Sequence, residues 1–303
     1  MNKKVGIALG GGAARGLAHI GVLKVLEKHN IPLKYIAGTS MGAIIGGFFA
    51  AGISALKIEN FALKLSGKKA LKLFYPSWSH SGFINGNNII KYLDALMPDR
   101  DISTLPIQFR AVATDFFSGE KHIIEKGSLW NAARASSSIP VIFTPAVTGH
   151  KILLDGGLSD PLPTSVVKKM GADIVISINV VPTPEYKKNI KNRRSLVNNL
   201  AVKINNWKLL PLRKSGRHFV NVEYNRKKRI LPSIMNISMQ TRNIIEYNLI
   251  MMDIDTNKPD FLIEPNKELT IGWFEFDRAK EIIRNGEKAA MNIIGPLIRK
   301  LNS

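Results

Sequence analysis

A serine flanked by glycines is the first residue of this chain that could do covalent chemistry. Ser40 is the centre of a G-x-S-x-G pattern over residues 38–42, between a short apolar run and a stretch of small and apolar residues. A serine on a sharp strand-to-helix turn exposes its hydroxyl, and Gly38 and Gly42 leave room for the chain to turn. The helix that follows would point its positive end at negative charge developing on a reacting carbonyl. The pattern predicts that Ser40 is a nucleophile, and the alternative is a glycine-rich packing turn.

A glycine-rich run after the first apolar segment could bind an anion. Consecutive glycines at a helix start expose backbone N–H groups to a phosphate or an oxyanion. A dinucleotide-binding fingerprint would need glycine at the position of Arg15 and an acidic residue within residues 31–37, and neither is present. A phosphate-binding P-loop would need a following Gly-Lys-Ser/Thr, which is also missing. We therefore predict an oxyanion hole at this run, formed by Gly10, Gly11, Gly12 and Arg15.

An aspartate followed by two glycines is the third feature. Asp155 ends an apolar run, and Gly156 and Gly157 would let another loop approach closely. This is a common turn on its own, and it gains significance only from its occurrence together with the other two motifs. A Ser-His-Asp triad in the α/β-hydrolase order needs a histidine after the acid, and only His218 follows, in an irregular basic region. None of the six histidines has a catalytic signature and no metal-ligand spacing is visible, so we expect neither a metal nor a cofactor.

These motifs lie within an alternating pattern of short apolar runs and helical repeats. Strands are expected at residues 5–9, 35–37, 109–114, 122–125, 152–154, 174–181 and 261–264. Helices are expected after the glycine-rich run and at residues 43–51, 53–74, 128–136, 237–252 and 276–298. Strands that alternate with helices imply a mostly parallel sheet covered on both faces. The sequence therefore predicts an α/β protein with three α/β/α layers around a mostly parallel central sheet.

In this order and spacing the three motifs resemble those of the patatin-like phospholipase family. The resemblance comprises the glycine-rich loop at residues 10–16, the nucleophile elbow at 38–42 and the Asp-Gly-Gly motif at 155–157. Three further segments, ATDFFSGE at 113–120, ARASSSIP at 133–140 and GADIVISINV at 171–180, are similar to bacterial members of the branch related to neuropathy target esterase. The resemblance is strong over residues 5–181 and returns with PDFLIEP at 259–265. One departure from the plant-type loop is an extra residue between the glycine triplet and Arg15.

This resemblance carries expectations about fold and mechanism. It implies a patatin-like catalytic domain over residues 5–168 and a C-terminal part, residues 169–303, that completes the same fold. It also implies a two-residue mechanism in which Asp155 accepts the proton of Ser40, and Ser40 forms an acyl-enzyme. Backbone N–H groups of the glycine loop would hold the oxyanion, and water would release a fatty acid from a phospholipid or lysophospholipid. The alternative is a lipid- or membrane-binding regulatory protein with little catalytic activity.

The chain is strongly basic, and much of the excess charge is concentrated in one segment. The net charge is +20, and fourteen Lys and Arg residues lie within residues 187–229, opposed only by Glu223. This basic irregular segment, at about residues 186–230, should attract lipid headgroups, so peripheral contact with an anionic membrane is expected. Nucleic acid is the rival polyanion, but no recognition motif supports it. The remaining alternative is a solvated basic surface.

Three features bear on the compartment. The chain has no cysteine, which excludes disulfides and thiol catalysis. The uncharged stretch at residues 35–56 is long enough to cross a bilayer, but it carries five glycines and is interpreted as a buried strand, turn and helix. The apolar run near the N-terminus is broken by three glycines, so no signal peptide is expected. We therefore expect a soluble, cytoplasmic protein whose membrane contact is peripheral, at the inner surface.

Overall fold

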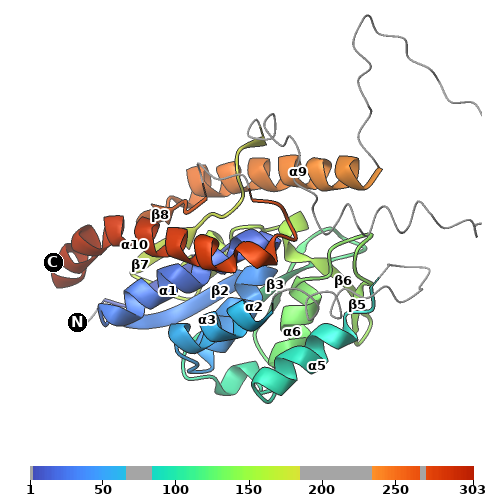
Figure 1. Ribbon diagram of the computed structural model, residues 1–303, viewed down its shortest axis with the longest axis horizontal. Helices are drawn as coiled ribbons and strands as arrows, with labels where there is room; N and C mark the ends of the chain where they lie inside the picture. The colour runs from blue at the N-terminus through green and yellow to red at the C-terminus, as the bar shows by residue number, and fades with distance from the viewer. Residues whose placement is uncertain (1–2, 66–83, 185–233, 267–270) are drawn as a thin grey trace, which may run out of the picture.

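The computed structural model describes residues 3–65, 84–184, 234–266 and 271–303, which form one mixed sheet with helices on both faces (Figure 1). The strands are β1 (Val5–Leu9), β2 (Leu33–Thr39), β3 (Gln108–Asp115), β4 (Lys121–Ile124), β5 (Ala146–Thr148), β6 (Lys151–Asp155), β7 (Ile174–Ile178) and β8 (Phe261–Ile263). Their order is β5-β6-β3-β2-β1-β7-β8, and β4 pairs with β3. The predicted α/β/α layers around a mostly parallel sheet are confirmed.

The parallel centre and the antiparallel edge of the sheet meet beside the candidate residues. Strands β3, β2, β1, β7 and β8 are parallel, whereas β6 is antiparallel to β3. Thr39 pairs with Val112, and Asp155 pairs with the next residue of β3, Ala113. Because Ser40 directly follows Thr39, this register places Ser40 and Asp155 level with each other on either side of β3.

Helices cover the two faces of the sheet unequally. One face carries α1 (Ala18–Lys28), α2 (Met41–Ala50), α3 (Ala55–Lys64), α5 (Asn87–Leu96), α6 (Leu129–Ser136) and α10 (Ala279–Asn302). The other face carries α7 (Thr164–Lys169) and α9 (Ile234–Asn257). In Figure 1, α10 lies along α1. On the other face, α9 packs against α7 and against the turn at residues 156–158 that follows β6.

The alternation of side chains along β1 explains why both faces are covered. Val5, Ile7 and Leu9 belong to a large buried cluster with α1, α2 and α10, whereas Ala8 packs with Val166 of α7 on the other face. Every residue of β1 and β7 is buried, as expected for parallel strands between two helical layers. Fully burying one Val, Ile or Leu side chain stabilises the fold by about 1.5–3 kcal/mol, so this central pair forms a firm base for the loops.

The expected elements are present, although several ends differ and some elements are additional. The helix expected at residues 43–51 begins at Met41, and α3 ends at Lys64. The rest of the helix expected at residues 53–74, like the basic segment, lies outside the described residues. The sequence pattern does not predict β5, α5 or α7. β5 and α7 span three and six residues, which is too short for a period to show.

The uncharged stretch at residues 35–56 forms the end of β2, a turn, α2 and the start of α3, which confirms its interpretation as buried structure. None of the helices in the described ranges combines the length and apolar character needed to cross a membrane.

Candidate active site

Ser40 occupies a sharp turn between β2 and α2. Its backbone has φ 54° and ψ −118°, and a positive φ is uncommon for a residue other than glycine. The turn requires neighbours without side chains: a Cβ on Gly42 would lie 2.1 Å from the Leu9 carbonyl oxygen, and one on Gly38 would lie 2.5 Å from the Gly42 carbonyl oxygen. The Ser40 amide donates to Ser136 Oγ at 2.8 Å. This strained strand-to-helix turn has the geometry expected of a nucleophile elbow.

Asp155 lies within hydrogen-bonding distance of this serine. Ser40 Oγ donates to Asp155 Oδ2 at 2.8 Å, and only 3% and 0% of the two residues is exposed. The second carboxylate oxygen, Oδ1, accepts from the Gly157 amide at 2.8 Å and from Arg242 Nη2 at 2.7 Å. A side chain at Gly156 would place its Cβ 2.1 Å from a carbonyl oxygen of β3, which accounts for the first glycine of the Asp-Gly-Gly motif. The structure thus brings the predicted serine and aspartate into direct contact.

The glycine-rich loop lies against Ser40, but its first two amides are already engaged. A Cβ on Gly11 would lie 3.5 Å from Ser40 Cβ, which places this part of the loop beside the serine. The Gly10 amide donates to the Ile178 carbonyl at 3.2 Å, and the Gly11 amide donates to the Pro161 carbonyl at 2.9 Å. These two N–H groups hold the loop on the sheet and are not free to bind an oxyanion.

Other amides near Ser40 remain available as donors. In the part of the chain that the structure describes, the amides of Gly12, Ala13 and Met41 have no hydrogen-bond acceptor. Gly12 and Ala13 continue the glycine loop, and Met41 begins α2 directly after Ser40. Ala13 has φ 50°, a further departure from ordinary backbone at this point. The geometry therefore favours these three amides, and not those of Gly10 and Gly11, as oxyanion donors.

Arg15, the charged residue of the predicted oxyanion loop, supports that loop from behind. Arg15 Nε donates to the Gly12 carbonyl at 3.2 Å, and Arg15 Nη2 donates to Asn243 Oδ1 at 3.2 Å. Its guanidinium carbon lies 5.0 Å from the ring centroid of Trp273. Burial lowers the pKa of Arg15 to about 10, so the group is still charged at neutral pH. These contacts indicate a positioning role for Arg15 in the loop.

His19 supports the same loop, although no sequence signature singles it out. Its Nε2 lies 2.7 Å from the Gly10 carbonyl oxygen, and because a carbonyl only accepts, Nε2 carries the hydrogen. The side chain is fully buried, and burial lowers the pKa of His19 to about 4. His19 is therefore a neutral donor at physiological pH.

Two charged residues of α9 complete the surroundings of Asp155. Arg242 Nε donates to Glu246 Oε1 at 2.6 Å, while its Nη2 reaches Asp155. Burial raises the pKa of Glu246, although the charge of Arg242 opposes the shift. Sequence reasoning misses both residues because an Arg and a Glu four positions apart in a helix ordinarily form an exposed pair. Only the fold shows that this pair points inward.

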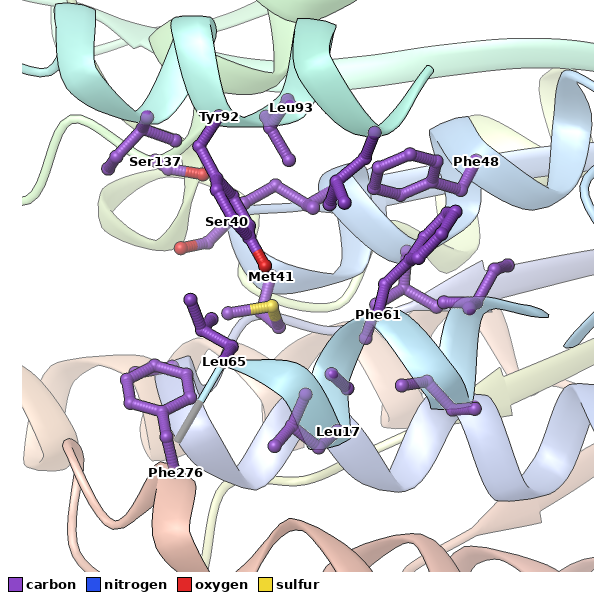
Figure 2. A pocket seen from close by; sticks show the side chains of 18 of the residues that line it. Leu17, Ser40, Met41, Phe48, Phe61, Leu65, Tyr92, Leu93, Ser137 and Phe276 are labelled. Atoms are coloured by element: carbon purple, nitrogen blue, oxygen red, sulfur yellow. The ribbon is translucent and has the colours of Figure 1, made fainter. Parts of the chain in front are cut away.

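An apolar cavity of about 120 Å³ lies beside Ser40 (Figure 2). Its walls come from α1, α2, α3 and α5, and almost all of them are apolar side chains. In Figure 2, Ser40 and Ser137 lie on one side of the cavity, and Phe48 and Phe61 lie on the other. These two phenylalanine rings pack with their centroids 5.6 Å apart. The serine therefore faces a space suited to a hydrocarbon chain.

A metal ion would need a group of side chains that could bind it. Among the residues that the structure describes, no group of three or more His, Asp or Glu side chains is arranged to hold a metal ion. The chemistry available at the site is that of a hydroxyl, a carboxylate and backbone amides.

The sequence of the chain is similar to a known family and to several known proteins. Residues 7–168 match the family model described as patatin-like phospholipase. The chain is 37% identical over 177 residues to an uncharacterized NTE family protein of Mycobacterium tuberculosis, covering 58% of this chain and 49% of that protein. It is 35% identical over 185 residues to lysophospholipase NTE1 of Debaryomyces hansenii, covering 59% of this chain and 12% of that enzyme.

A second lysophospholipase aligns over more of the chain, and one solved structure is also similar. The chain is 28% identical over 280 residues to lysophospholipase NTE1 of Scheffersomyces stipitis, covering 91% of this chain and 17% of that enzyme. The crystal structure of VipD from Legionella pneumophila superimposes with a TM-score of 0.49 at 12% identity, covering 97% of this chain and 67% of that one. The chain thus spans about half the length of the mycobacterial relative and a small part of the two lysophospholipases.

Proposed function

The chain belongs to the patatin-like phospholipase family, and on this basis we propose that it is a serine carboxylic-ester hydrolase that releases fatty acid from phospholipid or lysophospholipid. The observation that carries the proposal is the 2.8 Å hydrogen bond from Ser40 Oγ to Asp155 Oδ2 beside an apolar cavity. A hydroxyl on a strained elbow, bonded to a buried carboxylate, is a nucleophile paired with a base. The lysophospholipase relatives are named for this class of reaction.

Acylation would begin with attack of Ser40 Oγ on the acyl carbonyl carbon. Asp155 Oδ2 accepts the proton as the C–O bond forms, and the carbonyl oxygen becomes negatively charged. The free amides of Gly12, Ala13 and Met41 are the donors available to this oxyanion, and the start of α2 adds its positive end. Collapse of the intermediate returns the proton to the leaving alkoxide and leaves the acyl group on Ser40.

Deacylation would use the same two groups. A water molecule gives its proton to Asp155 and attacks the acyl carbonyl, and the released Ser40 oxygen takes the proton back as the fatty acid departs. A carboxylate is a weak base compared with a histidine side chain. The dyad therefore depends on alignment in a dry site, which the burial of both residues supports.

The apolar cavity supports an acyl chain as the group recognised. Its walls offer dispersion contacts and few hydrogen bonds, so they favour a hydrocarbon over a polar acyl group. A headgroup would then lie toward solvent, outside the cavity, so the cavity walls would not select one headgroup over another.

Activated-serine labelling tests the proposed function most simply. A fluorophosphonate probe should label the wild-type protein, whereas Ser40→Ala should not be labelled and Asp155→Asn should be labelled far more slowly. Ser118→Ala, which changes an exposed serine on the turn after β3, is the matched control and should behave as wild type. A panel of phospholipids and lysophospholipids should then show fatty-acid release that depends on Ser40. Lipid binding without labelling or turnover would instead support a regulatory, lipid-binding protein.

A cytoplasmic location with peripheral contact to the inner membrane also remains a proposal. It rests on the fourteen Lys and Arg residues within residues 187–229, which lie outside the described part of the chain. Reversing the charge of residues 226–229 should reduce co-sedimentation with anionic vesicles and leave hydrolysis of a short-chain ester unchanged. Equal binding to neutral and anionic vesicles would contradict this proposal.

A further inference from the structure

Four buried charged side chains form one cluster behind the candidate base. They are Asp155 and Glu246, which are fully buried, and Arg15 and Arg242, of which 1% and 8% is exposed. Two positive groups thus face two negative groups away from water. Both guanidinium groups lie over the ring of Trp273, with their carbons 5.0 Å and 4.9 Å from its centroid. Buried charges persist only when they are paired, so this arrangement must be specific.

Arg242 binds one oxygen of the Asp155 carboxylate and leaves the other oxygen to contact Ser40. Oδ1 accepts from Arg242 Nη2 at 2.7 Å and from the Gly157 amide at 2.8 Å, and Oδ2 is left to face Ser40 Oγ at 2.8 Å. Without the guanidinium, a fully buried carboxylate would keep only an amide and a hydroxyl as partners. The carboxylate would lose its nearest positive partner and would be free to rotate away from the serine.

Arg242 is itself held at two points, which makes its direction definite. Its Nε donates to Glu246 Oε1 at 2.6 Å, and its guanidinium lies over Trp273. Nη2 and Nε are different nitrogens of one planar fork, so a single lysine ammonium could not reproduce both contacts at these positions. The planar fork thus links the C-terminal helix α9 to the base on β6.

We propose that Arg242 is a positioning residue that holds the Asp155 carboxylate in the orientation that aims Oδ2 at Ser40. The inference rests on the proposed hydrolase function and adds to it a residue beyond the stretch that matches the family model, residues 7–168. It follows that the orientation of the catalytic dyad depends on α9, although both members of the dyad lie within the matched stretch, residues 7–168.

A kinetic comparison of variants on a water-soluble short-chain nitrophenyl ester tests this role. Because a general base contributes about 10²–10⁴-fold, Arg242→Gln should lower kcat by at least about tenfold, while KM stays within about twofold. Arg242→Lys retains the charge and should restore part of the lost kcat. Arg110→Gln is the matched control, because it breaks a surface pair with Glu125 of nearly the same length, 2.8 Å, and should leave kcat unchanged.

A double variant keeps the test decisive if a lone uncompensated charge prevents folding. Arg242→Met combined with Glu246→Leu removes one positive and one negative group, so the net charge of the buried cluster stays at zero. Replacing both partners by apolar side chains commonly preserves stability. The double variant should fold with a Tm near that of wild type and still lose at least about tenfold in kcat.

The outcomes separate the two claims. Folded Arg242 variants with wild-type kcat, alongside an active wild type and an inactive Ser40→Ala, would overturn the positioning role and leave the hydrolase function standing. A loss confined to KM would also overturn it. A wild-type protein with no turnover and no fluorophosphonate labelling would overturn the proposed function, and this inference with it.

Discussion

The backbone of Ser40 is strained, because a residue with a side chain is held at φ 54°. Such strain costs on the order of 1–3 kcal/mol and persists where surrounding contacts enforce it. Here the enforcing contacts are the close approach of Gly42 to the Leu9 carbonyl and the hydrogen bond from the Ser40 amide to Ser136. At the scale of the residue, the position of Ser40 therefore depends both on the absence of a side chain at Gly42 and on the hydrogen bond to Ser136.

His19 should make stability depend on acidic pH. Its pKa is lowered by burial to about 4 from an unfolded value of 6.5, so the unfolded chain binds the proton first as the pH falls. The stability held by neutral His19 is complete above pH 6.5 and is lost as the pH falls toward 4, by about 3 kcal/mol in total. His19→Gln keeps a donor for the Gly10 carbonyl but cannot be protonated.

Urea unfolding at several pH values measures this effect as a difference between proteins. The free energy of unfolding of wild type relative to His19→Gln should fall by about 3 kcal/mol between pH 7 and pH 4. The comparison is needed because Asp160, whose pKa burial raises to about 6, acts in the opposite direction in both proteins. A difference that stays constant with pH would show that His19 does not titrate as described.

In the glycine loop, alanine substitutions at the neighbouring positions Gly11 and Gly12 should have very different effects on kcat. A Cβ on Gly12 would lie 2.5 Å from Val180 Cγ2, so Gly12→Ala requires a shift of the Val180 side chain or of the loop that carries the Gly12 and Ala13 amides. A Cβ on Gly11 meets its nearest atoms at 3.5 Å, and the Gly11 amide is already bonded to Pro161. Losing an oxyanion donor typically costs about 10²–10³ in turnover, so Gly12→Ala should lose about that much in kcat and Gly11→Ala much less.

Gly11→Ala thus serves as the internal control for Gly12→Ala on the same short-chain ester. Equal losses of kcat in the two variants would contradict the assignment of donors. A loss of substrate affinity with unchanged kcat would instead make the loop a binding element.

The helix α3 should set the length of the acyl chain accepted. Phe61 of α3 packs against Phe48 on the side of the cavity away from Ser40, as Figure 2 shows. Phe61→Ala removes an aromatic ring from that wall and extends the space. The ratio of kcat/KM for a long-chain nitrophenyl ester to that for a short-chain ester should rise, by about tenfold or more if a few methylenes gain burial.

Leu56→Ala is the matched control for this change, because Leu56 lies on the same helix with 59% of its area exposed. It should leave the chain-length ratio unaltered. A preference that moves equally in both variants would show that α3 affects the cavity only through its own stability.

At the scale of the whole molecule, the C-terminal part, residues 169–303, packs against the stretch that carries the three motifs and completes the surroundings of the site. β7 lies beside β1, α10 packs along α1, and α9 brings Arg242 to Asp155. A Cβ on Gly286 of α10 would lie 2.0 Å from the Ala18 carbonyl oxygen, so these two helices touch backbone to backbone. We therefore propose that residues 169–303 complete the fold begun by the catalytic domain at 5–168.

The sequence predicts the parts of this molecule that local rules determine. Hydrophobic period and glycine placement predict most of the alternating strands and helices, though not β5, α5 or α7, and they predict the elbow at Ser40. They do not show which loop amides are free, since that depends on carbonyls of Pro161 and Ile178 far along the chain. Nor do they show that Arg242 points inward, because its contact with Asp155 joins residues 87 positions apart. Long-range packing therefore determines which loop amides are free and which side chains surround Asp155.

Trapping the acyl-enzyme tests the central claim most directly. The wild-type protein is mixed with a nitrophenyl ester, quenched in acid during the first turnovers, digested and analysed by mass spectrometry. We predict one added acyl group on the peptide that contains Ser40, no such adduct in Ser40→Ala, and slower formation in Asp155→Asn. Ester hydrolysis at the wild-type rate by Ser40→Ala, or an acyl group found on another residue of an active enzyme, would contradict the account.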